Sequence, residues 1–588
     1  MVKNATKIWQ RPWVPWIALG LAFFLLSLRA VNPYDIWYLL LAGEKFLQTG
    51  AVPQQEFFLY SGYGTPQLFG GWGYGVLAEL ARRTGGLVGL SLWNAALWTM
   101  CLLLGVVVLR QRAGLRLGQP FRSQEVGALL LTLVAIYPLL LDRTAFRPEV
   151  TAYILWLLAY ALLERGRRRN DFFQAWLLVP LLAWLEAWLH TAAVLFLPLL
   201  AAFMAEAVLE QRRLAEPRRL HSAFSWLGAL VATAVLPILN PNGAAQVYTN
   251  LAALLPTALA GGEMLPPGSA FQKTPMYNME YLPFWQLPHL YSLYIQATGL
   301  LIVLLLFGRR RLHMALSILP FTLYALLHAR GLSLWGLAML VPFGAFLLEW
   351  IPHFLTNKTQ QPCSDHDATR PAAARENYAL PVGLLCFLLS GIALQNGGWS
   401  WPKAQEPYTK LMRPLRENLP EGGNIFTEYH LGAITAWSLG ERYHVALAAH
   451  MVLPNPSAEL HYTRVMLRQD GWQEELKRNG VKAFVLDLVA LYGGQIMPLA
   501  RRLAYDSEWY LVAVSGTTGV FLRLPEQGVS AHDRLVALKR YWRVVADAPT
   551  VSAADRSLAQ HRLSQAEKLA GDELNWRLAQ ETETTQSP

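Results

Sequence analysis

Two carboxylates stand in the segment that follows the first apolar run of this sequence. Asp35 comes a few residues after that run, and Glu56 follows among aromatic residues. A positioned carboxylate can take a proton from an acceptor hydroxyl, which speeds a reaction by roughly 10²–10⁴, and it can also bind a divalent metal ion. We therefore predict Asp35 and Glu56 as catalytic residues. The structural alternatives are an N-cap role for Asp35, before a helix beginning at Ile36, and a solvated loop charge for Glu56.

Three arginines stand at the ends of long apolar segments, in connections that contain few other basic residues. Arg143 and Arg147 share one short connection, and Arg330 follows His328 in a later one. Guanidinium groups bind phosphates through charge-assisted hydrogen bonds, and lipid phosphates lie at the depth of such helix ends. The three arginines are predicted to bind a phosphate group. The alternative is that their side chains reach the membrane surface without a ligand.

Further ionisable residues lie at or between the apolar segments. Glu186 and His190 stand where two closely spaced apolar segments meet, and ionisable groups at membrane depth are commonly functional. Together with Glu280 and His328 they are predicted to bind substrate, although Glu186 and His190 could instead only pair with each other. The run CSDHD at 363–367 contains metal-ligand residue types, but it falls in a polar linker and is not predicted as a metal site.

The composition places these residues in a membrane protein. Of the 588 residues, 54% are hydrophobic and 15% are charged, and the mean hydropathy is +0.25, which is too apolar for an ordinary soluble protein. No GxGxxG, Walker, HExxH or GxSxG motif is present, so nothing supports nucleotide chemistry. The net charge of +10 is attributed to basic residues that mark the cytoplasmic loops of a membrane protein. No nucleic-acid partner is predicted.

Apolar runs recur along the first two thirds of the chain. A membrane-spanning helix needs ~20 mainly apolar residues. By this criterion the sequence predicts about eleven spans, centred on 14–31, 87–109, 125–141, 149–164, 172–188, 190–208, 223–239, 290–307, 313–328, 332–350 and 379–395. This pattern predicts an α-helical polytopic membrane protein.

Basic residues cluster in alternate connections between these runs. The clusters fall at 3–11, 110–122, 165–169, 212–219, 309–311 and 358–375. Because cytoplasmic loops carry the excess of Lys and Arg, the N-terminus is predicted to lie in the cytoplasm and everything after residue 396 outside. The chain is therefore predicted to be a multi-pass membrane protein whose C-terminal domain lies outside the cytoplasm.

From about residue 400 the pattern changes to that of a soluble α/β domain. Short apolar runs such as VKAFVLDL at 481–488 alternate with segments of helical spacing, which favours a small sheet with helices packed on it. The predicted regions are a membrane domain at 1–398, with a first outer loop at 32–86 and a long outer loop at 240–289, an outer α/β domain at 399–526, and a helical, partly disordered tail at 527–588.

Short motifs along the chain resemble those of a bacterial branch of the GT-C membrane glycosyltransferases. In the first outer loop, Asp-Ile-Trp-Tyr at 35–38 and Gly-Ala-Val-Pro at 50–53 are similar to that branch's pattern D-x-W-W-H-L…G-x-x-P. Further matches follow in the family's order: Arg147-Pro148-Glu149, Asn240-Pro241-Asn242-Gly243, Glu280 to Pro283, Ala329-Arg330 and Gly423 to Phe426.

The resemblance implies an enzyme that moves a sugar from a polyprenyl-phosphate carrier to a lipid, glycan or protein acceptor on the outer face of the membrane. In this family an acidic residue of the first outer loop is the usual general base or metal ligand, which points to Asp35. Arg143, Arg147 and Arg330 would then bind the carrier phosphate. A divalent metal ion is left open as a cofactor, with Asp35 as its ligand.

Several polar positions of the family's pattern are changed in this sequence. The family's histidine after W-W is Leu39 here, its H-E-W is Gly70-Gly71-Trp72, and its W-x-N-x-H keeps only His190. These changes leave a second function open, that of a catalytically inactive membrane scaffold of the same fold that binds an envelope protein through its outer domain. The predicted partners are membrane lipids and the polyprenyl-phosphate-linked sugar, with that envelope protein as a further one.

Overall fold

The computed structural model describes most of the chain. The described residues are 11, 13–29, 31, 36–112, 114, 115, 118, 119, 121, 123–140, 146–190, 192–214, 219–247, 312–327, 331–356, 406–448, 456–490, 494–523 and 530–568. The predicted spans centred on 290–307 and 379–395, and the part of the long outer loop from 248 onward, lie outside them.

The chain divides into two compact units. One, the helical unit, comprises Met1–Asn32, Gly70–Ala260 and Met279–Lys403, and the other, the α/β unit, comprises Pro33–Phe69, Gly261–Asn278 and Ala404–Pro588. The segment at 33–69, which lies between two parts of the helical unit in sequence, thus groups with the C-terminal region.

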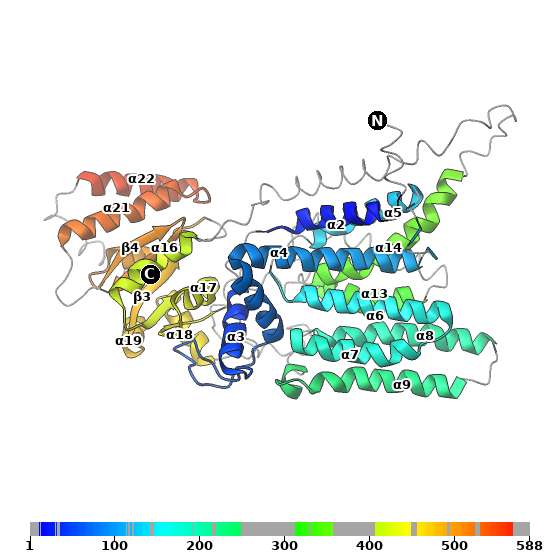
Figure 1. Cartoon of the computed structure of the whole chain (residues 1–588). Helices are drawn as coiled ribbons and strands as arrows, with labels where there is room; N and C mark the ends of the chain where they lie inside the picture. The colour runs from blue at the N-terminus through cyan, green and yellow to red at the C-terminus, as the bar shows by residue number, and fades with distance from the viewer. Residues whose placement is uncertain are drawn as a thin grey trace, which may run out of the picture. The chain divides into compact units, whose positions relative to one another are not determined.

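The described part of the helical unit consists mainly of α-helices, of which α4, α6, α7 and α9 run alongside one another (Figure 1). Each predicted span that falls within the described residues coincides with a helix. The helices are α2 (Val14–Ser27), α4 (Trp72–Arg112), α5 (Ser123–Leu140), α6 (Glu149–Arg169), α7 (Phe173–Leu189), α8 (Phe196–Leu214), α9 (Arg219–Val235), α13 (Leu312–Leu327) and α14 (Gly331–Thr356).

One of the described helices, α4, is long and apolar enough by itself to cross a bilayer, and several others are apolar but shorter. The helical character predicted from the sequence is therefore present, while the number of about eleven spans stays a prediction.

Helix α4 turns sharply near its start. Gly85 and Gly86 have non-helical backbone angles, with φ of +61° at Gly86. A Cβ placed on Gly89 would lie 2.8 Å from the carbonyl oxygen of Ala81, an approach that a straight helix does not allow because eight residues span ~12 Å. The glycines thus separate a first helix at 72–84 from the apolar span that follows. The sequence pattern predicts 72–84 as part of a loop.

Ion pairs identify one end of the helical unit. The carboxylate of Glu164, near the end of α6, lies 3.4 Å from Arg112 at the end of α4 and 2.7 Å from Arg167. Two arginine clusters that the sequence assigns to the same side of the membrane therefore meet at this end. We call it the Glu164 end.

The α/β unit is built on a five-stranded sheet with strand order β2-β1-β3-β5-β4. Strands β2, β1 and β3 are parallel, while β5 is antiparallel to both β3 and β4. The strands are β1 (Gly423–Thr427), β2 (Tyr443–Val445), β3 (Val481–Asp487), β4 (Trp509–Ser515) and β5 (Thr518–Arg523). The small α/β sheet predicted from the sequence is confirmed.

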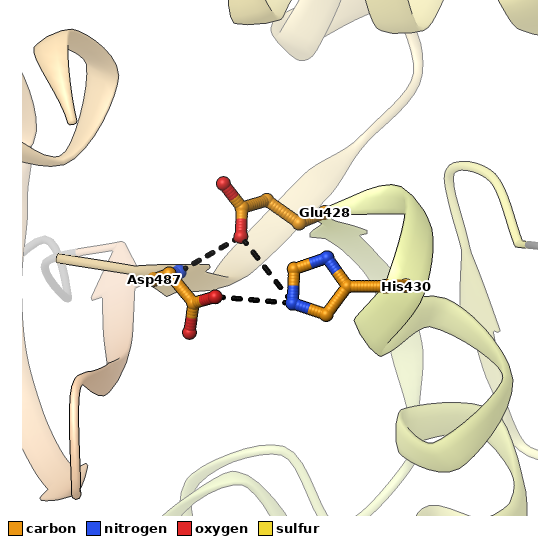
Figure 2. A group of neighbouring side chains, drawn as sticks. All are labelled: Glu428, His430 and Asp487. Atoms are coloured by element: carbon orange, nitrogen blue, oxygen red, sulfur yellow. Dashed lines mark hydrogen bonds and ion pairs between the residues drawn. The ribbon is translucent and has the colours of Figure 1, made fainter. Parts of the chain in front are cut away.

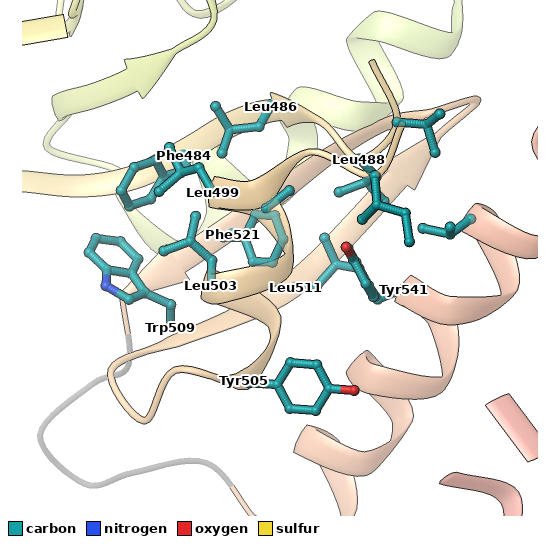
Figure 3. Packing of buried hydrophobic residues seen from close by; sticks show 14 of the residues in the cluster. Phe484, Leu486, Leu488, Leu499, Leu503, Tyr505, Trp509, Leu511, Phe521 and Tyr541 are labelled. Carbon is teal, nitrogen blue, oxygen red and sulfur yellow. The ribbon is translucent and has the colours of Figure 1, made fainter. Parts of the chain in front are cut away.

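Helices cover both faces of this sheet because successive strand side chains point to opposite faces. On one face, Ala483 and Val485 pack with Leu411 and Leu415 of α16. On the other face, Phe484 and the rest of a larger core pack with α18, α19, α20, α21 and α22 (Figure 3). The helices are α3 (Ile36–Thr49), α16 (Glu406–Asn418), α17 (Tyr429–Leu439), α18 (Pro456–Met466), α19 (Trp472–Arg478), α20 (Pro498–Tyr505), α21 (Ala531–Asp547) and α22 (Ala553–Lys568).

The segment around α3 is an integral part of the α/β unit. Trp37 of α3 is fully buried, and its ring centroid lies 4.6 Å from that of Trp437 in α17. After α3, Leu59 forms a parallel β-bridge with Val445 of β2. The first outer loop therefore supplies both core side chains and backbone hydrogen bonds to a domain that is formed mainly by residues after 406.

Candidate functional site

Several of the residues predicted from the sequence lie outside the described residues. They are Asp35, Arg143, Glu280, His328 and Arg330, and their roles stay predictions. The structure does place Glu56, Arg147, Glu186 and His190. Glu56 belongs to the α/β unit, whereas the other three belong to the helical unit.

Glu56 has a local structural task. Its side chain is buried, and its Oε1 accepts backbone hydrogen bonds from Phe57, Phe58 and Leu59 at 3.0, 3.0 and 3.1 Å. These bonds satisfy the amides of the tight turn that leads into the bridge with β2. The carboxylate therefore shapes the loop, which is a role that its sequence position alone did not indicate.

The other predicted residues gather at the end of the helical unit opposite the Glu164 end. Arg147 precedes α6, and its guanidinium lies 4.0 Å from the carboxylate of Glu149 in the first turn. Since α6 extends for 21 residues, or about 30 Å at 1.5 Å per residue, these residues are a full helix length from its other end. We call this the Glu186 end.

Glu186 is fully buried near the end of α7. Its Oε1 lies 3.4 Å from Nδ1 of His190, and its Oε2 accepts a hydrogen bond from Thr151 Oγ1 at 3.4 Å. Helix α7 ends at Leu189, where His190 adopts an extended backbone, so the imidazole turns back toward the last helical turn. The pairing considered from the sequence is thus present, and α6 contributes a third polar group to it.

The motif Asn240-Pro241-Asn242-Gly243 forms a turn beside this pair. The Oδ1 of Asn240 accepts the backbone N–H of Asn242 at 2.7 Å, and Asn242 donates from Nδ2 to Gln246 at 2.9 Å. Buried Gln246 then donates from Nε2 to the carbonyl oxygens of Ala187 and His190, both at 2.9 Å. The turn therefore holds the end of α7 in place, and sequence inspection had not singled out Gln246.

Three separate motif segments thus meet at the Glu186 end. The Arg147–Glu149 segment supplies a cation and a carboxylate, the end of α7 supplies the Glu186–His190 pair, and the 240–246 turn orients that pair. A guanidinium can bind a phosphate, and a carboxylate–imidazole pair can move or hold a proton. The arrangement has the groups needed to bind an anionic substrate and to activate a hydroxyl.

A second polar cluster lies in the α/β unit, at the carboxyl ends of the neighbouring parallel strands β1 and β3. Glu428 follows β1, His430 stands in the first turn of α17, and Asp487 ends β3 (Figure 2). His430 Nε2 lies 3.0 Å from Asp487 Oδ2 and 3.9 Å from Glu428 Oε2. The backbone N–H of Asp487 donates to Glu428 Oε2 at 3.1 Å.

The protonation of this cluster is strongly perturbed. Burial, with the charge of Asp487, raises the pKa of the Glu428 carboxyl to about 8. Burial acts to lower the pKa of His430, but the hydrogen bond to Asp487 and the two carboxylate charges outweigh it and leave that pKa raised. Such shifts mark clusters that hold protons or cations.

Sequence reasoning had treated these three residues only as parts of strands and helices. Glu428 and Asp487 are 59 positions apart, so nothing in local spacing connects them. A usable signal was present, because each carboxylate directly follows an apolar strand, and the carboxyl ends of adjacent parallel strands commonly form binding sites.

Comparison with known proteins bears on the fold. No protein-family model matches this sequence, and no curated protein matches it either. A crystal structure of the Archaeoglobus fulgidus oligosaccharyltransferase, tethered to an acceptor peptide, matches with a TM-score of 0.52 and 13% identity, over 89% of this chain and 75% of its own.

Two further solved structures match less well. ArnT from Cupriavidus metallidurans, bound to undecaprenyl phosphate, gives a TM-score of 0.48 and 12% identity over 87% of this chain and 98% of its own. The mycobacterial arabinofuranosyltransferase AftD gives 0.40 and 14% over 89% of this chain and 40% of its own. At such identities the likeness to the oligosaccharyltransferase establishes a shared fold.

Proposed function

We propose that this chain, which has the GT-C fold, is a membrane glycosyltransferase that moves a sugar from a polyprenyl-phosphate carrier to a lipid, glycan or protein acceptor. The reaction is assigned to the outer face of a bacterial inner membrane, with the N-terminus in the cytoplasm and the α/β unit in the periplasm. The distribution of basic residues supports this orientation.

One observation carries the proposal. Arg147 with Glu149, the buried Glu186–His190 pair and the 240–246 turn are far apart in sequence but meet at one end of the helical unit. Buried Glu164 pairs with arginines, whereas buried Glu186 lies against an imidazole and a hydroxyl, and ionisable groups of this kind at membrane depth are commonly functional. A purely structural bundle has no need of this arrangement.

The proposed roles follow from charge and position. Arg147, with Arg143 and Arg330, binds the carrier phosphate and stabilises the negative charge that develops on it as the leaving group. Asp35 removes the proton of the acceptor hydroxyl, or holds a divalent ion that does so, and Glu56 maintains the shape of the loop that carries it.

Substrate positioning is assigned to the remaining predicted residues. Glu186 and His190 hold hydroxyl groups of the sugar or the acceptor at the Glu186 end. Glu280 and His328 are proposed to contribute from their connections in the same way. We assign the binding of the acceptor, whether lipid, glycan or protein, to the α/β unit. Any envelope protein partner is proposed to bind the same unit.

Sugar transfer in proteoliposomes tests the proposal. A panel of radiolabelled polyprenyl-phosphate sugars is supplied to the wild type and to Asp35→Asn, which keeps the shape of the side chain and removes its charge. We expect product from the wild type with at least one donor and a rate lower by ~10² for the variant, the loss expected for a general base. Equal rates would remove Asp35 from the reaction.

A further inference from the structure

We propose that Glu428, His430 and Asp487 form a divalent-metal site in the α/β unit, separate from the predicted chemistry of Asp35. Each residue offers one ligand atom, and these atoms all lie within 4.8 Å of one another. In a tetrahedral site with bonds of ~2.1 Å, ligand atoms are separated by ~3.4 Å. The observed separations of 3.0 and 3.9 Å from His430 Nε2 bracket that value.

The donor atoms face one another because of the elements that carry them. The Oδ1 of Asp487 is held by Thr518 Oγ1 at 2.8 Å, which turns Oδ2 toward His430. The backbone N–H of Asp487 similarly holds Oε2 of Glu428. Figure 2 shows the three side chains converging from β1, α17 and β3. A bound ion would take the place of the proton that His430 Nε2 shares with Asp487.

The charge of the cluster also favours a cation. Glu428 and Asp487 are 2% and 4% exposed, and in the described part of the chain the ion pairs of both carboxylates are with His430. Two buried carboxylates face one imidazole, and ionising both of them in a low-dielectric interior is costly without a further cation. A divalent cation offsets this charge directly.

The Tyr408 hydroxyl lies within electrostatic reach of the cluster. The buried hydroxyl of Tyr408 in α16 has no hydrogen-bond partner among the described residues. Burial raises the pKa of this hydroxyl, and the charges of Asp487 and Glu428 raise it further, so it lies within their field. Buried polar groups without a partner call for an explanation, and an ion with its bound water supplies one.

A second cluster of the same residue types shows what a purely structural arrangement looks like. His461 Nδ1 lies 3.3 Å from Glu475, whose other oxygen is 3.1 Å from Arg464 and 3.3 Å from Arg478. There, arginines already compensate the carboxylate. For Glu428 and Asp487, by contrast, the ion pairs within the described residues are with His430 rather than with arginines.

The mixed ligand set indicates which ions to test. Imidazole nitrogen favours zinc and other transition metals, while carboxylate oxygen also suits manganese. His430 keeps 16% of its side chain exposed, so the site is open enough for an ion to enter and to keep a water ligand. Zn²⁺ and Mn²⁺ are therefore the probes, with Mg²⁺ expected to bind more weakly.

The test measures metal binding to the full chain in detergent micelles, purified without a histidine tag and stripped with a chelator. Equilibrium dialysis against Zn²⁺ and Mn²⁺, with the thermal unfolding midpoint as a second readout, compares the wild type with Glu428→Gln and Asp487→Asn. We expect both variants to bind one ion fewer than the wild type and to lose its metal-dependent rise in midpoint. Glu475→Gln, the matched Glu–His control, should retain the ion.

The outcomes separate the alternatives. If either buried variant fails to fold, the test uses His430→Asn, because His430 is more exposed. This variant should bind Zn²⁺ and Mn²⁺ at least tenfold more weakly than the wild type. Equal binding by wild type and His430→Asn, or no ion bound by the wild type up to about 1 mM, the weak limit of natural divalent sites, overturns the proposal. None of these readouts depends on sugar transfer.

Discussion

The hydroxyl oxygen of Tyr60 lies 2.6 Å from Nε2 of His461, which makes a hydrogen bond between residues 401 positions apart. Burial raises the pKa of the Tyr60 hydroxyl, so it stays protonated and available as a donor. The bond joins the first outer loop to α18. The α/β unit therefore needs a segment that the chain makes before most of its membrane helices.

Removal of this hydroxyl should destabilise the α/β unit. Tyr60→Phe leaves buried His461 without its Nε2 partner, and an unsatisfied buried polar group costs about 1–3 kcal/mol. The change in the free energy of unfolding is measured by denaturant unfolding of the full chain, with limited proteolysis of the α/β unit as the readout. Tyr63→Phe, at a 62% exposed ring in the same loop, is the control and should be neutral; equal loss in both variants would contradict the account.

The same relationship predicts how fragments of the chain behave. Residues 406–568 alone would expose Trp437 and the free edge of β2, because Trp37 and Leu59 are absent. Joined to residues 36–69 by a flexible linker, the fragment should be more soluble and unfold at a higher denaturant concentration. A truncated Trp37 costs about 3–5 kcal/mol in a packed core, so Trp37→Ala in the fusion should remove most of the gain. Identical midpoints for all three proteins would show that the loop adds nothing.

The His461–Glu475 pair predicts a pH dependence. Burial lowers the pKa of His461 more than Glu475 raises it. For Glu475, burial acts to raise the pKa, but the hydrogen bond and charge of His461, with Arg478 and Arg464, leave it lowered. In the folded protein the pKa values of His461 and Glu475 both lie below their unfolded values, which are about 6.5 and 4.3. The contribution of the pair to the free energy of unfolding is therefore fully present above these unfolded values and is lost as the pH falls.

Comparison with a variant isolates this contribution from the other titrating groups. The free energy of unfolding is measured by urea at pH 7.5 and pH 4.5 for the wild type and for Glu475→Gln with His461→Asn. The difference in the free energy of unfolding between the wild type and the double variant should be smaller at pH 4.5 than at pH 7.5. A difference that grows on acidification would reverse the sign and exclude the pair as its source.

Parts of this architecture could be predicted from sequence because they are local. Apolar runs mark helices such as α6 and α7, and alternating apolar segments mark the strands. Contacts such as Thr151 with Glu186, or Glu428 with Asp487, depend on which helices or strands become neighbours, and local periodicity does not encode that choice. The turn at Gly85 and Gly86 was likewise missed, because two adjacent glycines specify a break but not its angle.

The arrangement of charges predicts the sidedness of the two units. Arg168 and Glu421 are both exposed, so each can be replaced by cysteine in a cysteine-free background. An impermeant maleimide applied to intact spheroplasts should label Glu421→Cys, whereas Arg168→Cys should be labelled only after the membrane is permeabilised. Labelling of both positions from the same side would reject the predicted topology.

The most direct measurement of the central claim is the sugar-transfer rate of Glu186→Gln in proteoliposomes, compared with Glu164→Gln. Both carboxylates are fully buried in the helical unit, but only Glu186 lies at the end assigned to the reaction. Glu186 is proposed to accept a hydrogen bond from a hydroxyl of the sugar or the acceptor, and the loss of a hydrogen bond to a charged group costs about 1.5–3 kcal/mol. Glu186→Gln should therefore slow transfer at least tenfold with protein yield unchanged. Glu164→Gln should transfer at the wild-type rate once corrected for folded protein. Wild-type transfer by Glu186→Gln, or no transfer by the wild type with any polyprenyl-phosphate sugar, would contradict the account.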